Sequence, residues 1–502
     1  MKKFKIAFVS SEAVPFAKTG GLADVSGALP HALSELGHEV IMIMPKYGVI
    51  SEDKYKLNKV IDWVDVHLGD WLLEGTVYEG KFPGTGISVY FIDNKDFFNR
   101  QELYQINGRD YEDNLERFTF FSKAALETIK RLGIRPDIIH CNDWQTGLIP
   151  TYLKTIYSED PFFKGVKTIF TIHNLGYQGL FPKEKFHITG LGWEEFHFER
   201  LEFHGKLSLI KGGLVYADII NTVSKTYSRE IQTEEYGYGL DGLLRHREKD
   251  LYGVINGIDY NAWNPMIDKY IPAKFGLDNL SGKEKCKKAL QRESGLAVKD
   301  VPLLGMITRL TSQKGLDLIH DIIEELVSMD VQFLLLGTGE PDYHEFFKKV
   351  ASDYPRKISV TLGFDNGLAH RIEAGSDIFL MPSRYEPCGL NQLYSLKYGT
   401  IPLVRKTGGL ADTIVNYTPS NLKALKANGF VFREYSAKAL LDTIRKAVQL
   451  YSKKRLWQKL MLIGMKQDFS WTHSAIEYER LYRLGTKVLS KGIDLAMGNH
   501  ST

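Results

Sequence analysis

Two basic side chains, Arg309 and Lys314, lie in a short segment that directly follows the apolar run Leu303–Ile307. Arginine binds phosphate oxygens through a bidentate fork, and lysine binds them as a point charge. Together the two cations could hold a diphosphate and stabilise the negative charge that develops on it as it departs. The alternative interpretation is a solvated basic loop.

A carboxylate follows a second apolar run in the same half of the chain. Glu386 lies in the segment Ser383–Leu390, directly after Asp377–Met381. Pro387 disfavours a helix at the residue before it, so Glu386 is expected in a loop, where it can accept hydrogen bonds from sugar hydroxyls. The pair Gly389–Leu390 then begins a helix whose N–H groups could face a ligand. In the alternative, Glu386 only caps that helix.

One heptapeptide occurs twice, as Lys18–Asp24 and again, unchanged, as Lys406–Asp412. Each copy precedes a helical pattern and contains two adjacent glycines. Paired glycines at the N-terminus of a helix let backbone N–H groups approach an anion, which the helix dipole also favours. The sequence therefore predicts an anion-binding turn in each half; the alternative is two helix-initiating turns that use glycine for packing.

Polar side chains also follow two apolar runs in the first half. Asp143 and Trp144 follow one of them, and His173 and Asn174 follow the other. A carboxylate beside an aromatic ring suits a sugar, because the carboxylate accepts from hydroxyls and the ring covers the sugar face. A lone histidine at a strand end is often only a structural hydrogen-bonding residue, and this alternative stays open for His173.

Buried strands must position all of these residues. Continuous Ile, Val and Leu runs, rather than strict alternation, favour parallel strands that are covered on both faces. The expected strands are Ile6–Val9, Val40–Met44, Asp137–His140, Thr168–Thr171 and Asp218–Val223 in the first half, and Leu303–Ile307, Val331–Leu336, Ile358–Leu362, Asp377–Met381 and Ile401–Val404 in the second.

Helical patterns lie between these strands, as at Leu22–Leu36, where Gly37 supplies a stop. The sequence thus predicts an α/β protein with two doubly wound, Rossmann-like domains that face each other across a deep cleft. We expect an N-terminal domain at residues 1–250, a C-terminal domain at 251–480, and a tail at 481–502 that packs back on the N-terminal domain or is disordered.

Composition excludes several classes of function. The 502 residues carry 64 Lys and Arg against 61 Asp and Glu, a formal net charge of +3, which argues against nucleic acid and against an anionic membrane as a partner. The apolar run Ile6–Val9 is too short for a signal peptide, and no run approaches the ~18 apolar residues that span a bilayer.

The three cysteines are Cys141, Cys286 and Cys388, and their wide spacing fits a reducing compartment. We therefore expect a cytoplasmic protein. Cys388 has no neighbouring histidine to activate it and is expected to pack rather than to react. No metal-spaced cluster of Cys and His, no Walker A sequence and no dinucleotide fingerprint occurs, so neither a metal nor a cofactor is predicted.

In the order and spacing of its motifs, the chain resembles the glycogen and starch synthase family of retaining glucosyltransferases with the GT-B fold. The likeness covers nearly all of residues 1–480. The motifs that carry it are Lys18–Val25, Tyr111–Asn114 with Arg117-Phe118, Asn142–Trp144, His173-Asn174, Ile255–Asp259, the Arg309/Lys314 loop, Glu386–Leu390, Thr407–Leu410 and Phe469–Trp471.

The resemblance implies transfer of glucose from ADP-glucose, with UDP-glucose as the alternative, to the non-reducing end of glycogen or another α-1,4-glucan primer. It implies that Arg309 and Lys314 bind the donor phosphates and that Glu386 binds the donor glucose. His173 would lie against the reacting glucose, with its backbone carbonyl near the anomeric carbon. The other implied substrate-binding residues are Lys18, Gly20, Gly21, Asp24, Asp143, Asn174, Asn256, Cys388, Gly389, Leu390, Thr407, Gly408 and Gly409.

Two positions depart from patterns that the resemblance suggests. Tyr394 occupies the place where broader retaining relatives carry a second glutamate, and Asn391 stands where Thr or Ser is expected. The alternatives are a retaining GT-B transferase with another sugar or acceptor, and a catalytically silent glucan-binding protein on this fold. A nucleotide-dependent oxidoreductase would need a complete fingerprint after the first strand, and residues 11–15 provide none.

Overall fold

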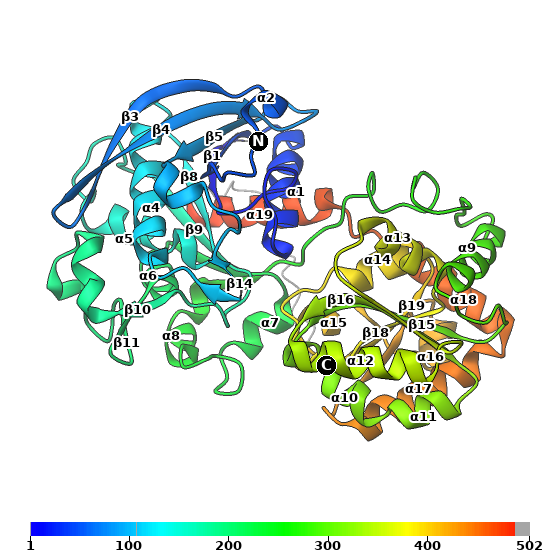
Figure 1. Cartoon of the computed structure of the whole chain (residues 1–502). Coiled ribbons are helices and arrows are strands. Elements are labelled where there is room, and N and C mark those ends of the chain that lie inside the picture. Colours follow the sequence, from blue (N-terminus) through cyan, green and yellow to red (C-terminus); the bar gives the residue numbers. More distant parts are fainter. Residues whose placement is uncertain (1, 107, 487–502) are drawn as a thin grey trace. The chain divides into compact units, whose positions relative to one another are not determined.

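The computed structural model describes residues 2–106 and 108–486, which form two compact units. Within these residues, unit 1 comprises residues 2–106, 108–223, 228–254 and 471–486, and unit 2 comprises residues 224–227 and 255–470. Each unit is an α/β assembly built on one large sheet (Figure 1). The fold class expected from the apolar runs is therefore confirmed.

The sheet of unit 1 has nine strands in the order β14-β13-β9-β8-β1-β2-β5-β4-β3. From β14 to β5 all neighbouring strands are parallel, whereas β4 runs antiparallel to both β5 and β3. The strands are β1 (Lys5–Val9), β2 (Glu39–Pro45), β3 (Asn58–Leu68), β4 (Trp71–Lys81), β5 (Ser88–Asp93), β8 (Ile138–Asn142), β9 (Lys167–Ile172), β13 (Ile219–Thr222) and β14 (Leu251–Gly253).

The helices of unit 1 include three long ones, α1, α4 and α19, and α19 comes from the far end of the chain. They are α1 (Gly21–Glu35), α2 (Glu52–Tyr55), α3 (Lys95–Phe98), α4 (Asn114–Arg131), α5 (Leu148–Lys154), α6 (Leu209–Tyr216), α8 (Asp241–His246) and α19 (Trp471–Gly485). Short strands form a hairpin, β6 (Gln105–Ile106) with β7 (Arg109–Asp110), and a small sheet of β10 (Leu180–Pro182), β11 (Glu202–Phe203) and β12 (Lys206–Ser208).

The sheet of unit 2 has six parallel strands in the order β17-β16-β15-β18-β19-β20. They are β15 (Leu303–Leu310), β16 (Gln332–Gly339), β17 (Ile358–Leu362), β18 (Ile378–Met381), β19 (Ile401–Arg405) and β20 (Phe430–Phe432). The helices are α9 (Ser281–Glu293), α10 (Leu316–Asp321), α11 (Ile323–Ser328), α12 (Pro341–Asp353), α13 (Asn366–Gly375), α14 (Asn391–Lys397), α15 (Gly408–Thr413), α16 (Pro419–Lys423), α17 (Ala437–Tyr451) and α18 (Lys454–Met465).

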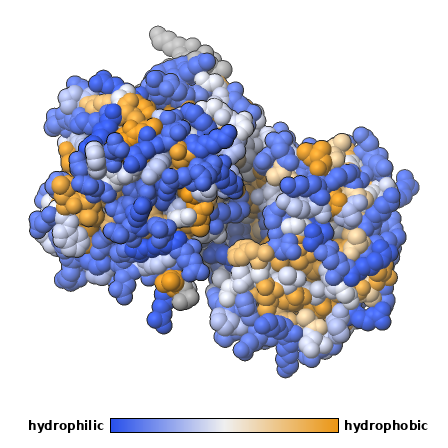
Figure 2. All heavy atoms as spheres, turned by 45° about the horizontal axis from the view of Figure 1, so that its top comes forward, coloured by the Kyte–Doolittle hydropathy of each residue, from blue (hydrophilic) through white to orange (hydrophobic). Residues whose placement is uncertain are grey.

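Side chains of alternating direction on the strands of unit 2 fill two separate cores. Leu304 and Met306 of β15 belong to one apolar cluster, whereas Leu303 belongs to another. Phe333 and Leu334 of β16 divide in the same way. Burial on both faces explains why these strands are continuous apolar runs in the sequence. On the face shown in Figure 2 the surface is mainly hydrophilic, with apolar side chains gathered in separate patches.

Helix α19 requires a correction to the expected domain division, which placed its first residues in the C-terminal domain. The helix belongs to unit 1, because Trp471, Tyr478 and Tyr482 are buried in one cluster with Phe4, Ile6 and Val25. The part of the expected tail from residue 487 lies outside the described residues. Within the described residues, no helix combines the length and the apolar character needed to cross a bilayer.

Candidate active site

Three neighbouring strands of unit 1 bring the predicted residues of the first half to one sheet edge. β9, β8 and β1 are adjacent and parallel, so the loops that follow them start at the same edge. The heptapeptide follows β1, Asp143 follows β8, and His173 follows β9. We call this group the first half-site.

The first heptapeptide copy forms the turn that begins α1, as predicted. Gly20 is the N-cap residue in extended conformation, and no side chain caps the helix. The ammonium of Lys18 lies 2.7 and 2.9 Å from the two carboxylate oxygens of Asp24. Burial raises the pKa of Asp24, and the charge of Lys18 lowers it in opposition. Lys18 and Asp24 therefore form one unit at the start of the helix.

Glu12 shapes this turn, although no local sequence pattern points to it. Its carboxylate is almost completely buried and accepts hydrogen bonds from the Thr19 hydroxyl (2.7 Å), the Gly20 N–H (3.2 Å) and the Tyr104 hydroxyl (2.8 Å). The role of Glu12 is hard to predict from the sequence, because a lone glutamate after a strand is common. A buried carboxylate with so many donors fixes the backbone of the turn.

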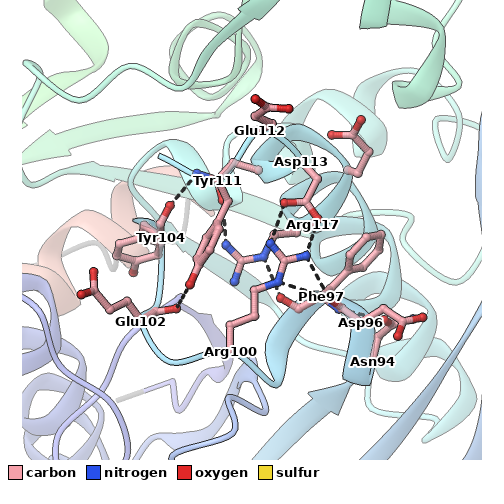
Figure 3. A network of polar contacts seen from close by, with 12 residues as sticks. Asn94, Asp96, Phe97, Arg100, Glu102, Tyr104, Tyr111, Glu112, Asp113 and Arg117 are labelled. Carbon is pink, nitrogen blue, oxygen red and sulfur yellow. Dashed lines mark hydrogen bonds and ion pairs between the residues drawn. The ribbon is translucent and has the colours of Figure 1, made fainter. Parts of the chain in front are cut away.

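Tyr104 is itself held by the motif Tyr111–Asn114; Figure 3 shows Tyr104 and Tyr111, with Arg117 nearby. The Tyr111 N–H and the Asn114 side-chain amide both donate to the Tyr104 carbonyl, at 3.0 and 2.9 Å. The Tyr111 ring lies 4.6 Å from the guanidinium of Arg100 and 5.0 Å from that of Arg117. The motif Tyr111–Asn114 thus supports the turn through Tyr104 and Glu12.

Asp143 has an unusual backbone conformation for a residue with a side chain. Its φ of 55° and ψ of −177° lie in a region that is nearly restricted to glycine and is strained by about 1–3 kcal/mol. The carboxylate accepts the N–H of His173 at 2.7 Å and also that of Asn174. Burial raises the pKa of Asp143 to about 7. The strained residue therefore holds the backbone at the end of β9.

The imidazole of His173 is buried and neutral. Burial lowers its pKa to about 3. Nε2 lies 3.0 Å from the Asn142 amide oxygen, and the Asn142 amide nitrogen donates to the Val9 carbonyl at 3.0 Å. Nε2 must therefore carry the proton, which assigns the tautomer. His173 thus makes structural hydrogen bonds at the same edge as the predicted ligand residues.

Trp144 is not an open platform for a sugar, and that prediction is wrong. Its side chain is only 9% exposed, and its ring packs edge-on against Phe118 at 4.9 Å. Gly179 lies so close to the ring that an added Cβ would meet it at 2.6 Å. The aromatic faces are therefore filled by the protein itself.

Unit 2 brings together the predicted residues of the second half, which we call the second half-site. Lys314 lies in the single turn after β15, and its ammonium is 2.9 and 2.7 Å from the two carboxylate oxygens of Glu386, in the loop after β18. The Ser383 hydroxyl donates to the same carboxylate at 2.9 Å. Glu386 therefore does not cap α14, whose N-cap residue is Leu390. Lys314 is not a solvated side chain, since it is largely buried in this pair.

The second heptapeptide copy is pressed against the Glu386 loop. The Gly409 N–H donates to the carbonyls of Glu386 and Pro387, both at 3.1 Å. A Cβ at Gly408 would lie 1.9 Å from the Glu386 carbonyl oxygen, and one at Gly409 would lie 2.0 Å from that of Cys388. Cβ atoms at Gly20 and Gly21 would meet nothing within 4 Å. The glycines serve packing in the second copy, whereas in the first they leave open space.

Two buried side-chain oxygens of the second half-site have no hydrogen-bond partner in the described part of the chain. They are the amide oxygen of Asn256 and the hydroxyl of Thr311. Buried polar atoms are normally satisfied, so these atoms are candidates for contact with a ligand. The backbone of Asn256 also hydrogen-bonds to Cys388, and burial raises the pKa of that thiol to about 12, which keeps it protonated.

Three further residues of unit 2, outside the predicted site residues, are Phe364, Asn391 and Tyr394. Phe364, in the loop after β17, is 88% exposed and could offer a ring face to a nucleotide base. Asn391, at the departure noted above, donates to the Ile307 carbonyl at 2.8 Å and thereby ties α14 to β15. Tyr394 stacks on Trp263 at 3.9 Å. Its ring therefore packs within unit 2 where other retaining transferases carry a carboxylate.

Comparisons with known proteins identify the family of the chain. Residues 5–246 match the family described as starch synthase catalytic domain, and residues 287–459 match the glycosyl transferases group 1 family. The chain is 48% identical to the glycogen synthase of Desulforudis audaxviator, with 99% of each protein covered. It is 47% identical to that of Koribacter versatilis, with 96% of this chain and 98% of the relative covered.

The chain belongs to the glycogen synthase family. It is a glycosyltransferase with the GT-B fold. The catalytic domain of starch synthase IV from Arabidopsis thaliana, solved with ADP and acarbose, superposes with a TM-score of 0.89 at 33% identity and covers 97% of this chain and 100% of that chain. Sucrose-phosphate synthase from Thermosynechococcus elongatus shares the fold at 16% identity, with a TM-score of 0.59 and 97% of this chain and 100% of that chain covered.

Within the described residues of this glycogen synthase family member, no group of three or more His, Cys, Asp or Glu side chains is placed to hold a metal ion. The prediction of a metal-free reaction stays a prediction.

Proposed function

We propose that the protein transfers glucose from ADP-glucose to the 4-hydroxyl at the non-reducing end of an α-1,4-glucan, with retention of configuration. The observation that carries this proposal is the contact between Lys314 and Glu386 at the carboxyl edge of β15 and β18. It sets a phosphate-binding cation beside a carboxylate that can accept from sugar hydroxyls, as a sugar diphosphate requires.

In this proposal Arg309 and Lys314 bind the diphosphate, and Glu386 binds the donor glucose. ADP as the nucleotide is supported by the starch synthase IV structure, which contains ADP. The exposed ring of Phe364 supplies a face on which a base can stack. Asn256, Thr407 and the backbone of Cys388–Leu390 are proposed to contact the rest of the donor.

In unit 1, we propose that Lys18 and the open turn at Gly20 and Gly21 take part in donor binding and that His173 lies against the reacting glucose. Because the Asp143 carboxylate also accepts the N–H of Asn174, the peptide that contains the His173 carbonyl is fixed in direction. The His173 carbonyl could then stabilise positive charge at the anomeric carbon.

The reaction would proceed on one face of the sugar. The acceptor hydroxyl attacks the face from which the diphosphate departs, and the departing phosphate takes the hydroxyl proton. Both cations stabilise the negative charge that develops on that phosphate, and orientation of the two substrates supplies much of the remaining acceleration.

A direct assay tests the proposal. Purified protein is incubated with glycogen and either ADP-glucose or UDP-glucose, without added metal, and polymer growth and the anomeric configuration of the new bond are measured. We expect α-1,4 growth with ADP-glucose. Growth only with another sugar nucleotide would assign a related transferase, and glucan binding without growth would assign a silent binding protein; either result contradicts the proposal.

We also propose that the protein works in the cytoplasm. All three cysteines are buried and unpaired in the structure, which suits a reducing compartment. Fractionation of the native host followed by immunoblotting tests this location.

A further inference from the structure

A four-residue segment, Ser224–Tyr227, departs from the unit in which its neighbours lie. The chain leaves unit 1 after Val223, directly beyond β13, and returns to it at Ser228. The residues between belong to unit 2, where they form the first turn of α7 (Lys225–Glu230). A segment of only four residues needs specific contacts to hold it in unit 2.

Ser224 makes the first of these contacts. Its side chain is fully buried, and its hydroxyl donates to the carbonyl of Pro387 at 2.6 Å. The same oxygen accepts the Tyr227 N–H at 3.1 Å and so caps α7. One hydroxyl therefore joins the start of this helix to the residue that follows Glu386.

Asp412 makes the second contact, with Thr226. One carboxylate oxygen accepts the Thr226 N–H at 2.8 Å, and the other accepts its hydroxyl at 2.6 Å. Asp412 is the last residue of the second heptapeptide copy, whereas the equivalent Asp24 pairs with Lys18. The equivalent aspartates thus have different partners: a lysine of the same heptapeptide in the first copy, and Thr226 in the second.

These contacts converge on the backbone that carries Glu386. The Pro387 carbonyl accepts from Ser224 on one side and from the Gly409 N–H on the other, and the Glu386 carbonyl also accepts from Gly409. We propose that Ser224 is a positioning residue for Glu386, and that the pair of Thr226 and Asp412 keeps Ser224 in register. This inference rests on the proposed role of Glu386 in binding the donor sugar.

Ser224→Ala tests the inference, with Ser436→Ala as the matched control. Ser436 caps α17 in the same unit by accepting the Ala439 N–H at 3.2 Å, so both variants lose one helix cap. We expect Ser224→Ala to lower kcat/KM for ADP-glucose at least tenfold, mainly through kcat, because small displacements of a sugar-binding group are costly. Ser436→Ala should stay within twofold of the wild type.

A second measurement does not depend on catalysis. Hydrogen exchange at the Gly409 amide reports whether the Glu386 loop is held, and it should accelerate in Ser224→Ala but not in Ser436→Ala. Unchanged exchange overturns the inference whichever reaction the wild type catalyses. Accelerated exchange with kcat/KM within twofold of the wild type also overturns it. A wild type that transfers no glucose refutes the proposed function instead.

The pair Thr226→Val and Thr226→Ser supplies the conservative rescue. Valine keeps the shape of threonine and loses the hydroxyl, whereas serine keeps the hydroxyl that bonds to Asp412. We expect Thr226→Val to lower kcat/KM severalfold and Thr226→Ser to restore it to within twofold of the wild type. Equal activity of the two variants would contradict the assigned role of Thr226.

Discussion

Lys314 and Glu386 form the most buried cation–carboxylate contact of the two half-sites. Their side chains are 17% and 8% exposed, so each charge depends on the other for much of its stabilisation. Removal of one side chain leaves the charge of the other unpaired in a largely buried site. This lowers the free energy of unfolding more than removal of both charges does. Two consequences follow, one for stability and one for catalysis.

For stability, we expect Lys314→Met to lower the free energy of unfolding of unit 2 by about 3 kcal/mol. The double variant Lys314→Met/Glu386→Gln should lose less than the sum of the two single losses, because the orphaned charge is gone. Calorimetry of the four proteins measures this cycle. Strictly additive losses would show that the pair is not coupled.

For catalysis, the same two single variants should each lower kcat/KM for ADP-glucose by at least a hundredfold, about 2.7 kcal/mol of transition-state stabilisation. Initial rates of glucan growth measure the effect. Wild-type turnover in either variant would refute the roles assigned to these residues.

His140 predicts how stability depends on pH. It is fully buried, and its ring nitrogens lie 2.9 Å from the Tyr482 hydroxyl and 2.6 Å from that of Thr171. Burial lowers its pKa to about 3, so the folded protein leaves it neutral where the unfolded chain protonates it. Stability should therefore fall as pH drops below about 6.5, by about 1.4 kcal/mol per pH unit from this residue alone.

The non-titrating variant His140→Gln should lack that component. Between pH 7.5 and 5.5 the wild type should lose about 1.4 kcal/mol more than the variant, measured by unfolding at both values. His31→Gln, which removes an exposed histidine, is the control and should keep the wild-type slope. Identical slopes for the wild type and His140→Gln would contradict the prediction.

The two heptapeptide copies show how one sequence can form two turns with different surroundings. Both begin helices at a sheet edge, but only the second is closed over by a neighbouring loop. The local sequence sets the turn, and the tertiary surroundings decide what the glycines are for.

Alanine substitutions separate the two cases. Gly409→Ala forces a Cβ to within 2.0 Å of a backbone oxygen and should destabilise unit 2 by about 3 kcal/mol. Gly21→Ala meets nothing within 4 Å, so its melting temperature should match that of the wild type while KM for ADP-glucose rises. Thermal unfolding and donor titration test both; equal destabilisation of the two variants would show that the surroundings do not matter.

The sequence predicts the strands that are long, continuous apolar runs. Every expected parallel strand is present, and some of them contribute to two cores, as β15 and β16 do. The parallel strands β5, β14 and β20 and the antiparallel strands β3 and β4 are not among the expected strands. In β3 the face from Lys59 to His67 is largely exposed, and its polar residues interrupt any apolar run. Hydrogen bonds between residues that are far apart in the sequence could not be predicted either. Neither the four donors to Glu12 nor the contact of Ser224 with Pro387 leaves a local pattern.

Unit 1 is assembled from stretches of chain that are far apart in the sequence. Helix α19 supplies Tyr478, whose buried ring lies 5.6 Å from that of His140 and whose hydroxyl accepts from Asn221 at 3.2 Å. The packing of His140 in β8 and the hydrogen bond of Asn221 in β13 therefore depend on a helix that begins at residue 471.

Tyr478→Ala should lower the stability of unit 1 by about 3–5 kcal/mol, because it empties a buried aromatic site. Hydrogen exchange should accelerate in peptides from β8 and β13 and stay unchanged in those from β15 and β18. Ile476→Ala, an exposed position of the same helix, should leave both groups unchanged. Acceleration confined to α19 would contradict the packing argument.

The late position of α19 in the sequence affects how unit 1 folds during translation. A ribosome delivers the strands of unit 1 early, yet the helix that covers Phe4 and Val25 emerges only after some two hundred further residues have been translated. The nascent chain must therefore carry an incompletely covered apolar surface while the rest of the polypeptide is made. We expect release of truncated products that end before residue 471 to yield chains that bind chaperones and aggregate.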